Sequence, residues 1–188
     1  MFRCFLVSAA LILAGMGAAP MSAATLNIDP RATDMGQFRV VVSIVDALKP
    51  AASGDVDLTF DGMEPIVLHF DLRELSDPKA LLGFKEKTAA GRTTHMFALA
   101  PVDVEKFERM GALMRRAKAE NRHGSFSFKF SVNSFCTLAP LPKGALFMDS
   151  WVFSNERTGF EQVEKDNDLR FDSAHKPVPR LDPPCAPV

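Results

Sequence analysis

Residues 124–136 read Gly-Ser-Phe-Ser-Phe-Lys-Phe-Ser-Val-Asn-Ser-Phe-Cys, which is the clearest alternation of apolar and polar side chains in this 188-residue chain. The apolar phase consists of Phe126, Phe128, Phe130 and Val132. Because successive side chains of a β-strand point to opposite faces, the pattern predicts a strand with one buried and one solvated face. The phase breaks at Phe135, which falls among the polar positions, so we expect a bulge or the end of the strand near Ser134.

The first 24 residues have the pattern of a secretory signal peptide. Arg3 supplies a positive start, residues 4–16 are apolar, and residues 22–24 are the small residues that a signal peptidase prefers. We therefore expect cleavage before Thr25, or a few residues away, and a protein that is periplasmic or secreted. The apolar run is shorter than the roughly 20 residues that span a bilayer, so we predict no stable membrane span in the mature chain.

Cleavage changes the cysteine count, because removal of residues 1–24 takes away Cys4 and leaves Cys136 and Cys185. Two cysteines in an oxidising compartment are most simply paired, so we predict a disulfide between them, with two free thiols as the alternative. The bridge would pin residues 173–188, a proline-rich tail that cannot build a core of its own.

The mature chain has a nearly even charge balance, since the 22 basic residues less Arg3 leave 21 against 23 acidic residues, a net charge of minus two. Such a balance would not attract nucleic acid or an anionic membrane, so we expect neither as a partner. The chain contains 16 Phe, one Trp and no Tyr. Because phenylalanine lacks the polar tip of tyrosine, we expect most of these rings in the core.

Period-two and β-branched patterns predict the other strands. They cover residues 38–45, 55–60, 66–71, 94–100 and 145–154, with a weaker strand over 160–164. The first is apolar in both phases, which is typical of a central strand covered on both sides. Asp61 and Gly62 predict a turn that joins the second and third of these strands as a hairpin. Residues 47–54 are predicted to be a loop because they contain Pro50 and Gly54.

Two helices are predicted. Ser76, Asp77 and Pro78 form the start signal of a short helix over residues 78–87. A longer helix is expected to begin with Asp103 as its N-cap and to end before Gly124. Its apolar positions recur every three or four residues and are Val104, Phe107, Met110, Met114 and Ala117. Such a stripe packs against a sheet.

Together these elements predict an α+β fold with a largely antiparallel sheet of six to seven strands and one long and one short helix on one face. A β-sandwich or a half-barrel with a plugging helix is the alternative. No shift in composition divides the mature chain. Residues 25–172 are therefore predicted to form a single α+β domain between the signal peptide at residues 1–24 and the tail at residues 173–188.

Residues that could carry chemistry are sparse. His69 and Asp71 lie two apart on a predicted strand and so share a face, and with His95 they are the candidates for a catalytic or metal-dependent site. The solvated face of a hairpin is the simpler explanation for His69 and Asp71, and a hydrogen-bonded structural histidine is the commoner case at a position such as His95. We find no motif of a serine, cysteine or zinc hydrolase and no nucleotide-binding loop, so we predict no metal and no cofactor.

An acidic group near the end of the chain consists of Glu164, Asp166, Asp168 and Asp172. Residues 166–168 resemble the start of a calcium-binding loop, but Arg170 occupies a ligand position and the glycine of such loops is missing. We therefore expect a solvated turn here.

A site for a small apolar ligand is a further hypothesis. Methionine and aromatic side chains adapt to apolar ligands, and the candidate lining residues are Phe107, Met110, Met114 and Trp151. At helical spacing, Phe107, Met110 and Met114 more often pack on a sheet, so packing is the alternative.

Three functions fit these observations. The first is an exported, non-catalytic protein that binds another protein in the cell envelope or outside the cell, which a disulfide-linked domain without a catalytic motif favours. The second is a carrier of a small apolar ligand. The third is a hydrolase or metal-dependent enzyme that uses His69, Asp71 or His95. We expect the first, and hence a binding protein rather than an enzyme.

Overall fold

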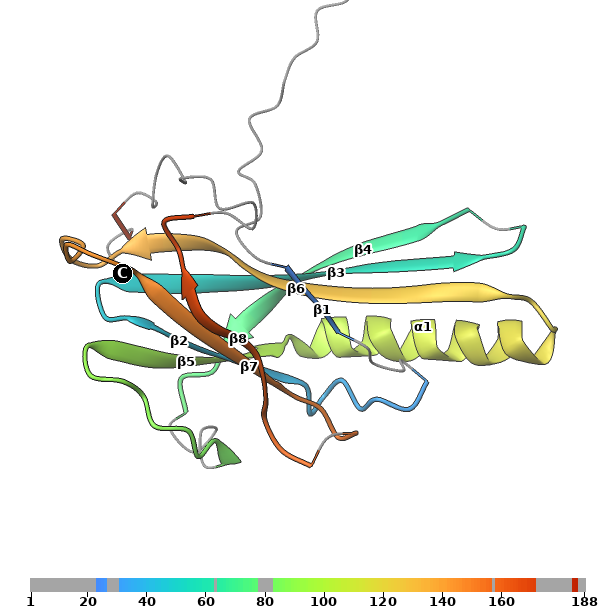
Figure 1. Ribbon diagram of the computed structural model, residues 1–188. Helices are drawn as coiled ribbons and strands as arrows, with labels where there is room; N and C mark the ends of the chain where they lie inside the picture. The colour runs from blue at the N-terminus through green and yellow to red at the C-terminus, as the bar shows by residue number, and fades with distance from the viewer. Residues whose placement is uncertain are drawn as a thin grey trace, which may run out of the picture.

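The computed structural model describes residues 23–26, 31–62, 64–77, 83–156, 158–171 and 184–185 of the chain. All but the last two residues of the predicted signal peptide lie outside these ranges, as does most of the predicted proline-rich tail. The described part consists of one antiparallel sheet and one long helix (Figure 1).

The eight strands of the described residues form a sheet in the order β1-β6-β3-β4-β5-β2-β7-β8, and every neighbouring pair is antiparallel. In chain order the elements are β1 (Ala23–Leu26), β2 (Arg39–Val45), β3 (Leu48–Phe60), β4 (Ile66–Glu74), β5 (Arg92–Leu99), α1 (Pro101–Ala119), β6 (Gly124–Thr137), β7 (Phe147–Phe153) and β8 (Glu161–Asp168). The sheet curls like a half-barrel, and α1 runs alongside β3, β4 and β6 (Figure 1). The sheet-dominated fold is therefore confirmed.

The predicted short helix over residues 78–87 is wrong in the part that the structure describes. Residues 84–89 have no regular secondary structure, and the residues just before Gly83 lie outside the described ranges. A helix of about ten residues is marginal in water unless an apolar face holds it to the protein. Here Phe84 instead makes edge-to-face contacts with Trp151 and Phe160 from an irregular segment.

The predicted loop over residues 47–54 is also wrong, because β3 runs through both Pro50 and Gly54. Proline is tolerated because β4 pairs with β3 only from Ala52 onward, so no strand on that side needs the amide hydrogen that proline lacks. A Cβ atom at Gly54 would lie 3.0 Å from the ring of Phe128. Glycine therefore allows this ring to pack closely on the backbone of β3.

The central position predicted for β2 is confirmed, since it lies between β5 and β7 and is buried from Val40 to Ile44. Alternate residues of β2 join the main core. Val41 joins a smaller cluster with Met96 and Trp151. Because neighbouring residues of a strand point to opposite faces, this smaller cluster lies on the other face of the sheet.

The apolar stripe of α1 packs on the sheet as predicted. Its buried residues are Phe107, Met110 and Ala117. The helix begins earlier than expected, because Ala100 is the N-cap residue and Pro101 is the first helical residue. Asp103 is therefore not the cap. It is a buried residue of the first turn whose carboxylate accepts a hydrogen bond from Lys106 Nζ.

The alternating stretch over residues 124–136 lies in β6, which pairs with β1 and β3. Phe128 is fully buried, and its ring centroid lies 5.3 Å from that of Phe38 and 5.5 Å from that of Phe107, both in edge-to-face geometry. The predicted break is confirmed as a bulge, since the register with β3 shifts by one residue at Asn133. The shift turns Phe135 into the main core.

The predicted disulfide is present between Cys136 and Cys185, whose Cα atoms are 4.8 Å apart. Pro184 pairs with Thr137 as an isolated bridge, and Cys185 donates its amide hydrogen to Thr137 O over 3.0 Å. Residues 184–185 are therefore held against the end of β6.

Candidate functional site

The edge of β4 is open over most of its length. β4 pairs with β3 from Ile66 to Leu72 but with β5 only from Leu72 to Glu74. From Ile66 to Asp71, the side of β4 that faces away from β3 has no strand partner in the described part of the chain. Open strand edges are templates for pairing with another chain, so this edge is the first candidate for a binding site.

One hydrogen bond identifies the β4 residues whose backbone groups point to the open edge. Leu75, just after β4, donates its amide hydrogen to Met96 O of β5 over 2.8 Å, and the two residues are directly opposite in the β4–β5 register. In an antiparallel pair such hydrogen-bonded positions recur at every second residue. The N–H and C=O groups of Val67, His69 and Asp71 therefore point away from β3.

A second hydrogen bond, at the other end of β3, gives the same result. Asp61 donates its amide hydrogen to His123 O over 3.0 Å, so the odd-numbered residues of β3 face β6 and the even-numbered ones face β4. Leu58 of β3 lies opposite Ile66 of β4. The even-numbered residues of β4 are thus bonded to β3, which leaves the odd-numbered residues for the open edge.

The two outermost strands of the sheet offer poorer edges. β1 has only four residues, and two of them, Ala23 and Ala24, belong to the predicted signal peptide. The neighbouring β6, which β1 covers only from Phe128 to Ser131, carries the bulge at Asn133, and the register of β8 with β7 shifts twice, on either side of Ser150. β8 also carries several acidic residues and a lysine. Bulges and charges are devices that keep an edge strand from pairing. The open edge of β4, in contrast, keeps a regular register and presents Val67 with 65% of its surface exposed.

The outer face beside this edge carries several charged side chains. His69 Nδ1 donates a hydrogen bond to Asp55 Oδ1 over 2.7 Å, and His69 Nε2 lies 3.6 Å from Asp71 Oδ1. The hydrogen bond to Asp55, together with the negative charge of both carboxylates, raises the pKa of His69. Lys129 Nζ lies 3.8 Å from a carboxylate oxygen of Asp57. Three carboxylates therefore share the face with Lys129, His69 and the exposed Arg73, which follows Asp71 in the same phase of β4.

The inner side of the edge faces α1. Lys106 Nζ lies 5.9 Å over the ring of Phe70 on β4, which places this flank of the helix next to β4. Leu113, 42% exposed, lines a surface hollow of about 210 Å³ together with Phe60 at the end of β3. Val102 is three helical turns before Leu113 on the same flank and is also exposed. The inner side therefore combines exposed apolar side chains with Lys106 and, around the hollow, with Arg116, Glu120 and Arg122.

The structure does not bring the catalytic candidates together. His69 and Asp71 are neighbours on the outer face of β4, whereas His95 lies on β5 and donates through Nδ1 to Glu74 Oε1 over 2.7 Å. Glu74 is five residues further along β4 than His69, or about 16 Å at the rise of a strand. Within the described ranges, no group of three or more His, Cys, Asp or Glu side chains is arranged to hold a metal ion.

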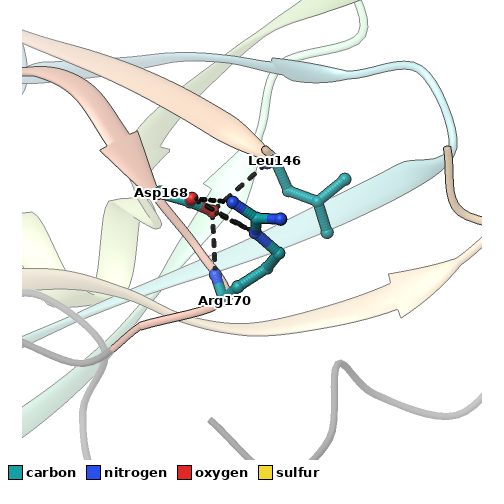
Figure 2. Close-up of polar contacts among 3 residues, drawn as sticks. All are labelled: Leu146, Asp168 and Arg170. Atoms are coloured by element: carbon teal, nitrogen blue, oxygen red, sulfur yellow. Dashed lines mark hydrogen bonds and ion pairs between the residues drawn. The ribbon is translucent and has the colours of Figure 1, made fainter. Parts of the chain in front are cut away.

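The acidic residues near the end of the chain lie mostly in β8 rather than in the expected solvated turn. Figure 2 shows the carboxylate of Asp168, which accepts hydrogen bonds from the amide of Leu146 and from the amide and guanidinium of Arg170. The hydrogen bonds from Arg170 lower the pKa of Asp168 to about 2. Burial raises the pKa of Glu164. Asp172 lies outside the described residues.

Asp168→Asn is expected to lower the free energy of unfolding by about 1 kcal/mol at pH 7, because the amide loses the charge-assisted bonds and water screens a partly exposed ion pair. The folded-state pKa of Asp168 is below the ordinary 3.8 of aspartate. Its contribution is therefore complete above about pH 4 and disappears as the pH falls toward 2. Urea unfolding of both proteins at pH 7 and at about pH 2.5 should show a difference that shrinks in acid. An equal difference at the two pH values would contradict this account, and Asp61→Asn in an exposed turn is the control.

The candidate ligand-lining residues do not share one cavity. Phe107, Met110 and Met114 lie in the main core or pack against it, whereas Trp151 belongs to the smaller cluster on the other face. Phe107 also lines a surface hollow of about 400 Å³. The charged residues around that hollow are Arg31, Asp34, Glu108 and Arg115. A rim of this kind does not favour an apolar ligand.

Comparison with known protein families, with curated proteins and with solved structures gives no significant match to this chain. No helix in the described part of the chain combines the length and the apolar character that a bilayer crossing requires. Function is therefore inferred from the geometry, and the open edge of β4 is the feature that sequence reasoning missed. The one local sign of it is Val67, an apolar residue in the polar phase of its strand.

Proposed function

We propose that this chain is an exported, non-catalytic protein that binds another protein of the cell envelope or the extracellular space by accepting a strand of that partner at the open edge of β4. The observation that carries the proposal is the regular edge from Ile66 to Asp71, which has no strand partner among the described residues. An added strand gains affinity from main-chain hydrogen bonds and specificity from its alternate side chains. The signal-peptide pattern and the disulfide support export.

The two alternatives have less support. A hydrolase needs a histidine with a ring nitrogen that is free and accessible to a nucleophile and substrate. Asp55 and Asp71 lie beside the two ring nitrogens of His69, and Nε2 of His95, which has no hydrogen-bond partner among the described residues, is buried. A carrier of an apolar ligand needs an apolar cavity, but the aromatic and methionine side chains of the α1 stripe pack against the sheet. Neither objection applies to strand addition.

The proposal predicts that a photoreactive amino acid at Val67 captures one defined protein when the native host cells are irradiated. The same amino acid at Leu138, which is 58% exposed in the loop after β6, should not capture that protein. Mass spectrometry identifies the captured protein and also the N-terminus of the mature chain, which is expected at Thr25 or a few residues away.

A pair of substitutions at Asp71 tests whether the backbone is responsible for the capture. Asp71→Pro removes an amide hydrogen that points to the open edge but leaves the bonds between β3 and β4, so capture at Val67 should be lost. Asp71→Asn removes the charge, as proline does, but keeps the amide hydrogen, so capture should persist, although more weakly. Circular dichroism confirms that both variants are folded. Capture that is equal at Val67 and Leu138, or that survives Asp71→Pro, would overturn the proposal.

A further inference from the structure

A strand added to β4 would meet two different environments. Its side chains would alternate between the outer face of the sheet and the side that faces α1, because side chains of a strand alternate with period two. The chemistry of the two sides therefore determines the sequence of the partner segment. This step rests on the proposed function, since it requires a strand at the β4 edge.

The outer side favours positive charge in the partner. Asp55 and Asp57 already lie beside the cations His69 and Lys129, and Arg73 follows on the same face of β4. Asp71 is the carboxylate at the open edge itself, and its side chain is 93% exposed. Directly opposite residues of paired strands lie about 4.5–5.5 Å apart at Cβ, so a cation opposite Asp71 would be within reach of its carboxylate. An acidic residue at the same place would be repelled.

The inner side favours apolar residues in the partner. Ile66 and Leu68 are partly buried against the main core, and Leu113 on α1 is 42% exposed. Apolar side chains on the added strand would cover this surface and remove it from water. A cation placed on the inner side would instead approach Lys106, which lies over Phe70.

We infer that the partner contributes an extended segment in which lysine or arginine residues on the outer side alternate with apolar residues on the inner side. A second copy of this chain fits the edge less well. Two β4 strands paired about His69 would place Val67 of each copy opposite Asp71 of the other, so neither Asp71 would meet a cation, and the two His69 side chains would lie opposite one another. Charge complementarity therefore selects a basic partner over self-association.

Synthetic peptides of about nine residues, long enough to cover the edge, test the inference. The probes alternate lysine with valine, serine with valine, or glutamate with valine, and binding to the mature protein is measured by fluorescence anisotropy at about 50 mM salt. We expect the lysine–valine peptide to bind about tenfold more tightly than the serine–valine peptide and the glutamate–valine peptide to bind most weakly.

Matched charge variants provide the control. Asp55→Asn combined with Asp71→Asn should weaken binding of the lysine–valine peptide about tenfold and remove the preference over the serine–valine peptide. Glu105→Gln combined with Glu108→Gln removes the same number of charges from α1 and should leave the affinity unchanged. Both pairs lie at exposed positions, so the fold is expected to persist.

The outcomes separate this inference from the proposed function. If the serine–valine or glutamate–valine peptide binds as tightly as the lysine–valine peptide, and Asp71→Pro abolishes that binding, strand addition stands and the basic partner is refuted. If the lysine–valine peptide binds equally well to Asp71→Pro, strand addition itself is refuted. No binding by any peptide, or a dimer of the free protein that Asp71→Pro disrupts, also overturns the inference, and capture at Val67 then decides the proposed function separately.

Discussion

The Phe128→Ala variant is expected to lose about 3–5 kcal/mol of unfolding free energy, the range observed for truncation of a buried aromatic ring. Phe128 is fully buried and joins three parts of the core through its contacts with Phe38, Phe107 and the backbone at Gly54. Alanine would leave a cavity between α1 and the sheet that the rigid strands cannot fill. Because a domain of this size has a total stability of about 5–15 kcal/mol, the variant should be close to unfolding.

Urea unfolding followed by tryptophan fluorescence measures this loss, since the chain has one tryptophan. Phe147→Ala is the matched control, because Phe147 is 36% exposed and lies at one end of β7. Its loss should be about 1 kcal/mol or less, as for most substitutions at the surface. Equal losses for Phe128→Ala and Phe147→Ala would contradict the central position of β6 in the core.

Removal of the disulfide is expected to have a comparable effect. Cys136 and Cys185 are separated by 49 positions in the sequence. Closing a loop of that length lowers the conformational entropy of the unfolded chain. In the chain-entropy description this raises the free energy of unfolding by about 4 kcal/mol. The double variant Cys136→Ser, Cys185→Ser should therefore unfold at a markedly lower urea concentration than the oxidised protein.

A reducing agent supplies the control for this prediction. Dithiothreitol should lower the stability of the parent protein to that of the double serine variant and should not affect the variant. Thiol titration of the denatured, unreduced mature protein should detect no free thiol. Two free thiols per chain would show that the bridge does not form in the protein as produced.

Elements governed by local pattern could be predicted from the sequence. The alternation that defines β6, the doubly apolar run of β2 and the hairpin of β3 and β4 depend on side chains that follow one another directly. The bulge at Asn133 was predictable for the same reason, since a shift of one residue is the way to bring Phe135 to the buried face. The helix start was misplaced because Pro101, a favourable first helical residue, was not counted.

The errors arose where distant contacts outweigh local preference. Pro50 and Gly54 are loop residues by propensity, yet both lie in β3 because all thirteen of its residues pair with β6, far away in sequence. Strand order depends on the same kind of distant pairing. The sequence can therefore indicate that residues 66–71 form a strand, but not that β5 leaves its outer edge free.

Hydrogen exchange at the amides of β4, with and without the lysine–valine peptide, tests strand addition most directly. The amide hydrogens at the open edge belong to Val67, His69 and Asp71, and those bonded to β3 belong to Ile66, Leu68 and Phe70. The account predicts that the first three exchange rapidly in the free protein and are protected when the peptide binds, while the other three change little. Bound peptide without protection of the first three amides, or with protection confined to another strand, would contradict it.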